Sequence, residues 1–251
     1  MAVLACLAPA PARAGGATGG PAAEPIGPPG VVDVVSRLDH RGLAAAGTGI
    51  VLSNGDVLTN NHVIRGALQV RINLPGRPAH RAVVLGADPA HDVALLAVDG
   101  PWAPTPATLG DSSTVAVGDP VEAIGNAGGV GVLSIAPGVV TGLDESVIAS
   151  AENGSRPEAL QGMLETNADI RPGDSGGPLV NAAGQVIGMD TAALSGGAPD
   201  GYAIPINAAM AVADAFPSTP SATIPASERR HPHRARGTRR PRFSREARGR
   251  A

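Results

Sequence analysis

The chain has 251 residues, 43% of them hydrophobic, which is enough for a sizeable core and excludes wholesale disorder. Aromatic residues make up only 2%, so Val, Ile, Leu and Ala have to fill that core. The formal net charge of -3 hides an uneven distribution, because ten of the 19 basic residues, all of them Arg, follow Glu228.

The N-terminal segment MAVLACLAPAPARA is apolar and ends in Ala12-Arg13-Ala14, a small-x-small pattern typical of a signal-peptidase site. A cationic n-region is missing, which indicates either the remnant of a longer export signal or an apolar disordered terminus. Residues 15–30 are rich in Gly and Pro and are predicted to be a linker. The single Cys6 excludes an internal disulfide, and no stretch approaches the roughly 20 apolar residues that span a bilayer. We expect an exported protein, secreted or held in the cell envelope or periplasm.

From about residue 31 to residue 216, short β-branched runs alternate with turns at the regular spacing typical of an all-β barrel or sandwich. The pair Asn54-Gly55 predicts a tight hairpin turn between two of the runs. Only VVDVVSRL (31–38) and NAAMAVADAF (207–216) look helical. The predicted strand segments are GIVLSNGDVLTNN, LQVRINL, AVVLGAD, VALLAV, PVEAIGN, GVVTGL and PLVNAAGQVIGMD.

The C-terminal segment differs from the rest in composition. Residues 228–251 carry ten Arg and two acidic residues, a net charge of 10 - 2 = +8. Dense Arg with Pro and Gly cannot bury apolar surface, so we expect a disordered basic tail over 217–251. It is either an electrostatic arm for an anionic polymer or an unselected, out-of-frame extension. With Phe243 as its one aromatic residue, it specifies no particular nucleic acid.

Ser175 lies in RPGDSGGPLV, a stretch too irregular for a helix and too rich in Gly for a strand interior. A serine hydroxyl becomes a nucleophile when a base takes its proton and a third group orients that base. Among six histidines, His62 directly follows the predicted strand DVLTNN. Asp92 opens the apolar strand DVALLAV, where a carboxylate needs a partner. His91 is the rival base, but adjacent side chains of a strand point to opposite faces, so His91 and Asp92 cannot easily share a role.

Four motifs in order, LTNNHVI, HDVALL, RPGDSGGPLVN and GYAIPIN, resemble the HtrA/DegP group of trypsin-like serine proteases, in particular its secreted actinobacterial members. The match covers about residues 45–210. The resemblance implies two six-stranded antiparallel Greek-key barrels of the chymotrypsin type, with the active site in the crevice between them. We place the barrels at residues 31–115 and 116–216, the second ending in a short closing helix.

Carried over to this sequence, the resemblance makes Ser175 the nucleophile, His62 the general base and Asp92 the carboxylate that orients it. The backbone N–H groups of Gly173 and Ser175 would bind the oxyanion. The function implied is a serine endopeptidase that cleaves exposed or unfolded polypeptides through an acyl-enzyme, with neither metal nor cofactor. The alternative is a catalytically silent peptide-binding or chaperone-like module on the same fold. Relatives are often trimers, so a homo-oligomer is possible.

The sequence leaves two interpretations of the substrate pocket. Asp169 lies six residues before Ser175, the spacing at which trypsins carry the acid that binds basic P1 side chains, whereas the HtrA group generally uses a shallow apolar pocket. We therefore keep two interpretations of Asp169, a specificity residue and a surface carboxylate. Ile170 would line the same pocket, and the segment 189–191 would form its other wall and pair with the substrate backbone. The predicted substrate-binding residues are Asp169, Ile170, Met189, Asp190 and Thr191.

Two features depart from the pattern of the group. Many relatives have Asn before the nucleophile, whereas this chain has Asp174, as digestive trypsins do. In those enzymes the carboxylate pairs with a new N-terminus, and because no matching activation site is visible, Asp174 needs another partner. The second departure is a linker-like PSTPSATIPAS that leads to the Arg-rich tail where relatives usually continue into a PDZ domain. A frameshift that removed this domain is one explanation.

Overall fold

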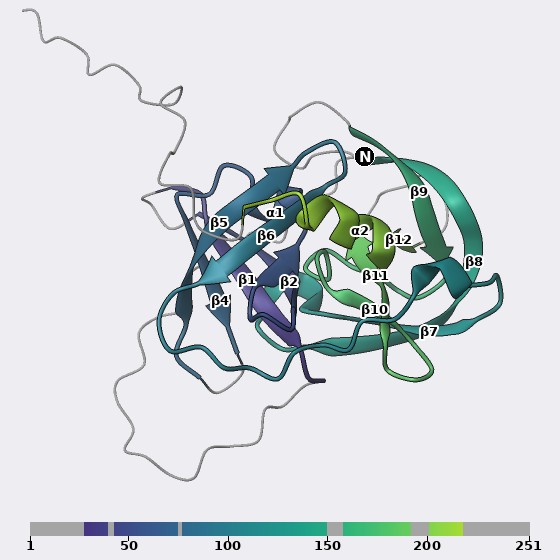
Figure 1. Cartoon of the computed structure of the whole chain (residues 1–251), viewed down its shortest axis with the longest axis horizontal. Coiled ribbons are helices and arrows are strands. Elements are labelled where there is room, and N and C mark those ends of the chain that lie inside the picture. The colour runs from purple at the N-terminus through teal and green to yellow at the C-terminus, as the bar shows by residue number, and fades with distance from the viewer. Residues whose placement is uncertain (1–27, 40–42, 75–76, 150–157, 192–200, 218–251) are drawn as a thin grey trace, which may run out of the picture. The chain divides into compact units, whose positions relative to one another are not determined.

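The computed structural model describes residues 28–39, 43–74, 77–149, 158–191 and 201–217 (Figure 1). The expected signal remnant, most of the linker and the Arg-rich tail lie outside these residues. Twelve strands in the described part form two closed six-stranded barrels, with every pairing antiparallel. This confirms the predicted fold class.

The first barrel has the strand order β1-β2-β3-β6-β5-β4 and is closed by pairing of β1 with β4. Because β3 lies beside β6 and not beside β4, the chain crosses the barrel in the Greek-key manner. Its strands are β1 (Val31–Arg37), β2 (Ala44–Val51), β3 (Val57–Thr59), β4 (Gln69–Asn73), β5 (His80–Asp88) and β6 (Val93–Val98). A one-turn helix, α1 (Asn61–Ile64), follows β3.

The second barrel repeats this order as β10-β11-β12-β9-β8-β7 and is closed by pairing of β7 with β10. Its strands are β7 (Pro120–Gly125), β8 (Ser134–Ala149), β9 (Glu158–Thr166), β10 (Pro178–Asn181), β11 (Val186–Thr191) and β12 (Gly201–Pro205). Two single turns of 3₁₀ helix, η1 (Ser112–Thr114) and η2 (Ala127–Gly129), flank β7. Helix α2 (Ile206–Ala213) follows β12, as the sequence predicted for this region.

Aliphatic side chains fill the cores, as the scarcity of aromatic residues requires. The first barrel has its own cluster of Val, Ile, Leu and Ala, and the second has a smaller one. A third cluster joins residues of both barrels to the inner face of α2, through Ile206, Ala209 and Ala213. Removing these side chains from water stabilises the fold by roughly 25 cal/mol per Å² of apolar surface, and α2 thereby fastens the barrels to each other.

The structure corrects one predicted element and confirms another. VVDVVSRL forms strand β1 and not a helix, since its β-branched side chains suit a pleated strand and the run pairs on both sides, with β2 and β4. The predicted hairpin at Asn54-Gly55 joins β2 to β3, with Ile50 opposite Leu58 and Gly55 at a φ of +88°. This positive φ is readily adopted by glycine.

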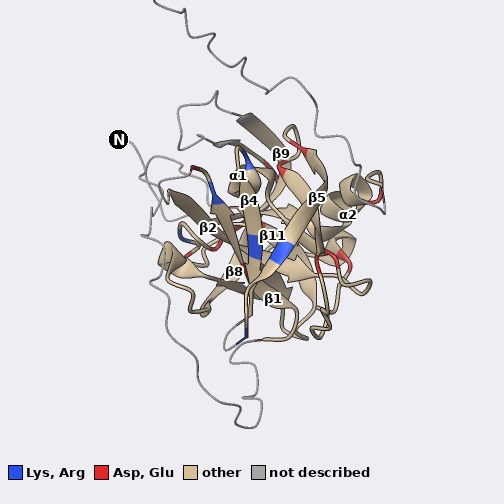
Figure 2. Ribbon diagram, turned by 90° about the vertical axis from the view of Figure 1, so that its left-hand side faces the viewer, with Lys and Arg blue, Asp and Glu red and all other residues tan. Residues whose placement is uncertain are grey.

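Charged residues are scattered over the described part of the chain, and Figure 2 shows the Arg positions as separate segments. None of the described helices has the length and apolarity needed to cross a membrane.

Candidate active site

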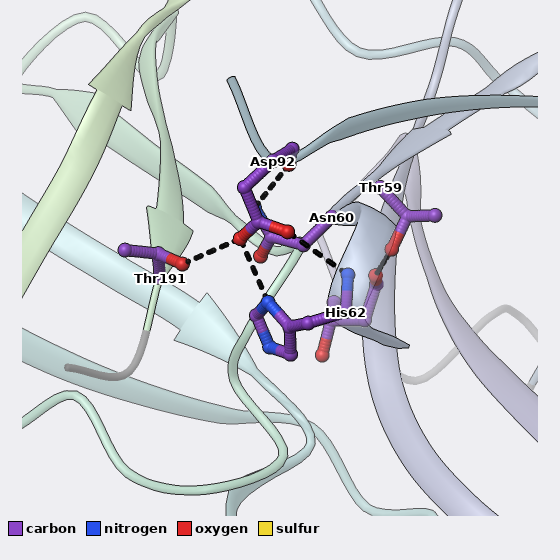
Figure 3. Close-up of polar contacts among 6 residues, drawn as sticks. Thr59, Asn60, His62, Asp92 and Thr191 are labelled. Carbon is purple, nitrogen blue, oxygen red and sulfur yellow. Dashed lines mark hydrogen bonds and ion pairs between the residues drawn. The ribbon is translucent and has the colours of Figure 1, made fainter. Parts of the chain in front are cut away.

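The site begins where β3 and β6 end side by side. Thr59, the last residue of β3, is paired with Ala94 at the start of β6. His62 follows β3 on the short helix α1, and Asp92 directly precedes β6, so the strand pairing brings the two side chains together. The Nδ1 of His62 lies 2.7 Å from Oδ2 of Asp92 (Figure 3). Their side chains are 33% and 3% exposed, respectively, so the carboxylate is buried while the imidazole reaches the surface.

Asp92 is held by several hydrogen bonds besides the one to the imidazole. Its Oδ1 accepts from the backbone N–H of His62 at 2.9 Å, and its Oδ2 from the hydroxyl of Thr191 at 3.2 Å. Its carbonyl oxygen accepts from the side-chain amide of Asn60 and the backbone N–H of Asn61. The residue has a φ of +54°, which is uncommon for a residue other than glycine. Such a network overdetermines the position of one carboxylate.

This arrangement fixes the tautomer of the imidazole. A carboxylate only accepts hydrogen bonds, so the Nδ1 that faces Asp92 carries the proton. The other ring nitrogen, Nε2, is then the basic one, which is the state required of a general base. His91, the rival base, is exposed and pairs with Asp88 at 2.7 Å instead.

The Ser175 loop, residues 171–177, lies against the first barrel near α1. The backbone N–H of Thr48 on β2 donates to the carbonyl of Ser175 at 2.8 Å. A Cβ at Gly176 would lie 2.3 Å from the hydroxyl of Thr59 and 3.2 Å from the amide nitrogen of Asn60. The loop therefore meets the same β3–α1 junction that carries His62, and Ser175 itself is 5% exposed.

Two contacts orient the peptide units around Gly173. The carbonyl of Pro172 accepts a hydrogen bond from Gly128 at 2.7 Å. Because C=O and N–H point in opposite directions across a trans peptide, this bond turns the N–H of Gly173 away from Gly128. The carbonyl of Gly173 accepts from the hydroxyl of Thr48 at 2.8 Å. Gly173 has a φ of +104°, and a Cβ there would lie 2.1 Å from the carbonyl oxygen of Asn126, so glycine is required by conformation and by space.

Asp174 forms no ion pair with a cation among the described residues. Its Oδ2 accepts from the backbone N–H of Arg171 at 2.9 Å, and the side chain packs against Gly125. Burial raises the pKa of Asp174 to about 6. Burial also raises the pKa of Asp190 well above its ordinary value, and the negative charge of Asp174 adds to that rise.

The predicted substrate-binding residues divide into an exposed and a buried set. Asp169 is exposed, and its carboxylate accepts a hydrogen bond from Nε of Arg171 at 3.0 Å, a position that favours the surface interpretation. Ile170 is half-buried, with its side chain near Gly201. The buried set on β11 comprises Met189, Asp190 and Thr191. Residues 192–200, which follow this wall, lie outside the described residues.

Several residues that hold the site are not marked by any motif in the sequence. Thr48 and Asn126 connect the barrels, since the backbone N–H of Asn126 donates to the hydroxyl of Thr48 at 2.9 Å. Thr191, which we expected to contact substrate, donates a hydrogen bond to the carboxylate of Asp92. In the sequence, the one available signal for Thr48 is a threonine within the apolar run AAAGTGIV. Within the described ranges no group of three His, Cys, Asp or Glu residues is arranged to hold a metal ion.

Comparison with known proteins agrees with this geometry. The trypsin-like peptidase domain matches residues 47–189. A probable periplasmic serine endoprotease DegP-like of Pseudomonas savastanoi is 40% identical over 183 residues, which cover 70% of this chain and 35% of that protein. The serine protease PepD of Mycobacterium tuberculosis is 37% identical over 198 residues, or 70% of this chain and 42% of PepD.

Among solved structures, that of the HtrA-type protease AlgW with tripeptide has a TM-score of 0.63 and 32% identity, covering 74% of this chain and 59% of that one. The chain thus spans less than half the length of the two relatives named above. The match over residues 47–189 runs from β2 to β11, so it covers most strands of both barrels, and it includes His62, Asp92 and Ser175. The chain belongs to the trypsin-like peptidase family, in its HtrA/DegP group.

Proposed function

We propose that the protein is a serine endopeptidase with Ser175 as nucleophile, His62 as general base and Asp92 as the orienting carboxylate. The observation that carries the proposal is the hydrogen bond of 2.7 Å between His62 and the buried Asp92, beside a loop that carries a serine between Asp and Gly. A buried carboxylate that fixes one imidazole tautomer is the arrangement that activates a hydroxyl for attack.

The proposed reaction starts with attack of the Ser175 hydroxyl oxygen on the carbonyl carbon of a peptide bond. Nε2 of His62 takes the hydroxyl proton, and the N–H groups of Gly173 and Ser175 bind the oxygen that becomes negative. Each such donor contributes roughly 2.7 to 4 kcal/mol to transition-state stabilisation. The imidazolium then gives its proton to the leaving amine. Water hydrolyses the acyl-enzyme by the same steps, and Ser175 recovers its proton.

The substrates we propose are exposed or unfolded polypeptides, cleaved outside the cytoplasm as part of protein quality control. The relatives support this choice through their names, which include a probable periplasmic serine endoprotease. Asp169 is exposed and paired to Arg171, and Met189 is fully buried in the core. The half-buried Ile170 is thus the predicted pocket residue that remains within reach of a substrate, which favours an apolar P1 side chain. A homo-oligomer is proposed on the resemblance alone.

A fluorophosphonate probe tests the proposal directly, because it reacts with an activated serine. Labelling of the folded chain should be lost in Ser175→Ala and reduced by several orders of magnitude in His62→Ala. His91→Ala is the matched control, since His91 is exposed and pairs with Asp88 away from the site. Folded protein that takes up no label, or label that survives Ser175→Ala, would favour the catalytically silent peptide-binding module.

A further inference from the structure

Two buried carboxyl groups lie behind the Ser175 loop, and the proposed reaction uses neither of them. Asp174 is 3% exposed and Asp190 is fully buried. Their backbones are close, because Asp190 exchanges hydrogen bonds of 2.8 and 2.7 Å with Gly176 and Gly177, and the N–H of Gly177 also donates to the carbonyl of Asp174. The two side chains therefore occupy one small region between the loop and β11.

The side chains converge on the end of β7. Oδ1 of Asp174 lies 2.5 Å from the position that a Cβ of Gly125 would take. The carboxyl of Asp190 lies near the backbone N–H of the preceding residue, Ile124, close enough for that dipole to favour its ionised form slightly. The charge of Asp174 also acts on Asp190. The two carboxyls thus lie at neighbouring residues of β7, Asp174 at Gly125 and Asp190 at Ile124.

Three of the pair's four carboxylate oxygens lack a hydrogen-bond donor in the described part of the chain, while Oδ2 of Asp174 accepts from the backbone N–H of Arg171. Among the described residues, no donor in hydrogen-bond geometry reaches Oδ1 of Asp174 or either carboxylate oxygen of Asp190. Neither group forms an ion pair with a described cation. The positive charge of Arg171, at the surface, lowers the pKa of Asp174, and the negative charge of Asp169 raises it. The β7 residues at this point, Ile124 and Gly125, have no titratable side chain.

A buried carboxylate without a donor is costly, and two adjacent carboxylates cannot both ionise readily. A protonated carboxyl, in contrast, supplies an O–H donor. One retained proton would therefore leave only one of the two buried groups charged. The pair then titrates as a unit, with its last proton lost at a higher pH than either group would show alone.

We propose that Asp174 and Asp190 together retain at least one proton at neutral pH, and that this partial neutralisation lets the Ser175 loop keep its position without a cation. Asp190 is then a positioning residue, which acts on Ser175 through Asp174. The inference rests on the proposed function only where it concerns catalysis. Loss of the last proton leaves two buried negative charges at neighbouring positions of the loop and β11, and the loop has to move to relieve them.

The sign of the pH effect follows from the direction of both shifts. Because folding raises both pKa values, the folded chain binds more protons than the unfolded chain between the ordinary and the raised values. Stability therefore falls as the pH rises through this window. The labelling rate of Ser175 should fall in turn once the last proton leaves, although deprotonation of an imidazole base normally raises such rates with pH.

The experiment uses the full chain and compares Asp190→Asn, Asp174→Asn and the double variant with the parent. An Asn amide supplies a hydrogen-bond donor that does not titrate. We expect the pH at which labelling by the fluorophosphonate falls to half to rise by about one unit or more in each single variant, and the melting temperature to depend less on pH. Asp88→Asn, at an exposed carboxyl bonded to His91, is the matched control. Profiles that superimpose on the parent's would overturn the proposal.

Infrared spectroscopy gives a readout independent of activity and of folding in the pair variants. The C=O stretching band of a protonated carboxylic acid should be present near pH 7 and vanish at alkaline pH. It is recorded in an Asp33→Asn background, because Asp33 is another buried acid with a raised pKa. No such band at pH 7 would refute the retained proton. If the band is present in folded protein that takes up no label, the retained proton would be supported and the proposed protease function would be rejected.

Discussion

The hydroxyl of Thr48, in the first barrel, donates a hydrogen bond of 2.8 Å to the carbonyl of Gly173, in the second. The same hydroxyl accepts from the backbone N–H of Asn126 at 2.9 Å, and the side chain is fully buried. One side chain therefore connects β2, the end of β7 and the Ser175 loop. The orientation of the proposed oxyanion donor in one barrel depends on a residue of the other.

Replacing Thr48 by valine should disturb this connection with little change of volume. Thr48→Val leaves the carbonyl of Gly173 and the N–H of Asn126 buried without their partner, which we expect to lower the free energy of unfolding by about 1 to 3 kcal/mol. The fluorophosphonate labelling rate of Ser175 should fall about tenfold or more through misplacement of the loop. Thr48→Ser keeps the hydroxyl, and it should retain most of the labelling rate. A loss in Thr48→Ser with none in Thr48→Val would mean that the methyl group, which packs near Gly177, matters and the hydroxyl does not.

The same contact shows what the sequence could and could not predict. His62, Asp92 and Ser175 stood in local motifs, and the strands of both barrels were visible as β-branched runs, so these were predicted. Thr48 and Gly173 are 125 positions apart, and no local pattern joins them. The helix predicted for residues 31–38 is wrong for a related reason. The conformation of β1 is decided by its pairing with β4, which lies outside the local sequence window.

Asp92→Asn should abolish most of the proposed activity while leaving the fold intact. An asparagine amide can hydrogen-bond the imidazole in the wrong tautomer, so Nε2 of His62 would carry the proton and no longer act as base. We expect kcat on a peptide substrate to fall by about 10⁴-fold. Asp88→Asn makes the same chemical change at the exposed partner of His91 and should leave kcat unchanged. An Asp92→Asn enzyme with near-parental kcat would remove Asp92 from the mechanism.

Gly173→Ala separates steric from conformational demands. The substitution puts a Cβ 2.1 Å from the carbonyl oxygen of Asn126, at a φ of +104°. Gly118 has a similar φ of +95° with no atom within 4 Å, so Gly118→Ala isolates the strain of the backbone. We expect Gly118→Ala to cost about 1 to 2 kcal/mol of stability, measured by denaturant unfolding. Gly173→Ala should cost more and also abolish labelling of Ser175, and equal costs would argue against the close approach.

Asp169 provides a test of P1 preference. Its carboxylate is exposed and bonded to Arg171, so an incoming basic side chain would have to displace an existing partner. We expect Asp169→Ala to leave the ratio of kcat/KM for peptides with apolar and with basic P1 residues unchanged, as measured by digestion of a peptide library. A selective loss of cleavage after Arg and Lys would restore the interpretation of Asp169 as a specificity residue.

Asp33 should make the whole fold less stable as the pH approaches neutrality. It is a buried residue of β1 whose Oδ1 has no hydrogen-bond partner among the described residues, and burial raises its pKa to about 6. The folded chain then holds a proton that the unfolded chain has lost, so the free energy of unfolding falls between about pH 4 and pH 6 by an amount of the order of 2 to 3 kcal/mol. Asp33→Asn removes this titration, and its stability should depend less on pH, as measured by denaturant unfolding from pH 4 to pH 8. In Asp88, by contrast, the hydrogen bond from His91 lowers the pKa, so this carboxyl titrates below the range measured and Asp88→Asn should keep the parental dependence of stability on pH. If the stability of Asp33→Asn depended on pH as steeply as that of the parent, the Asp33 carboxyl would not be the cause of this dependence.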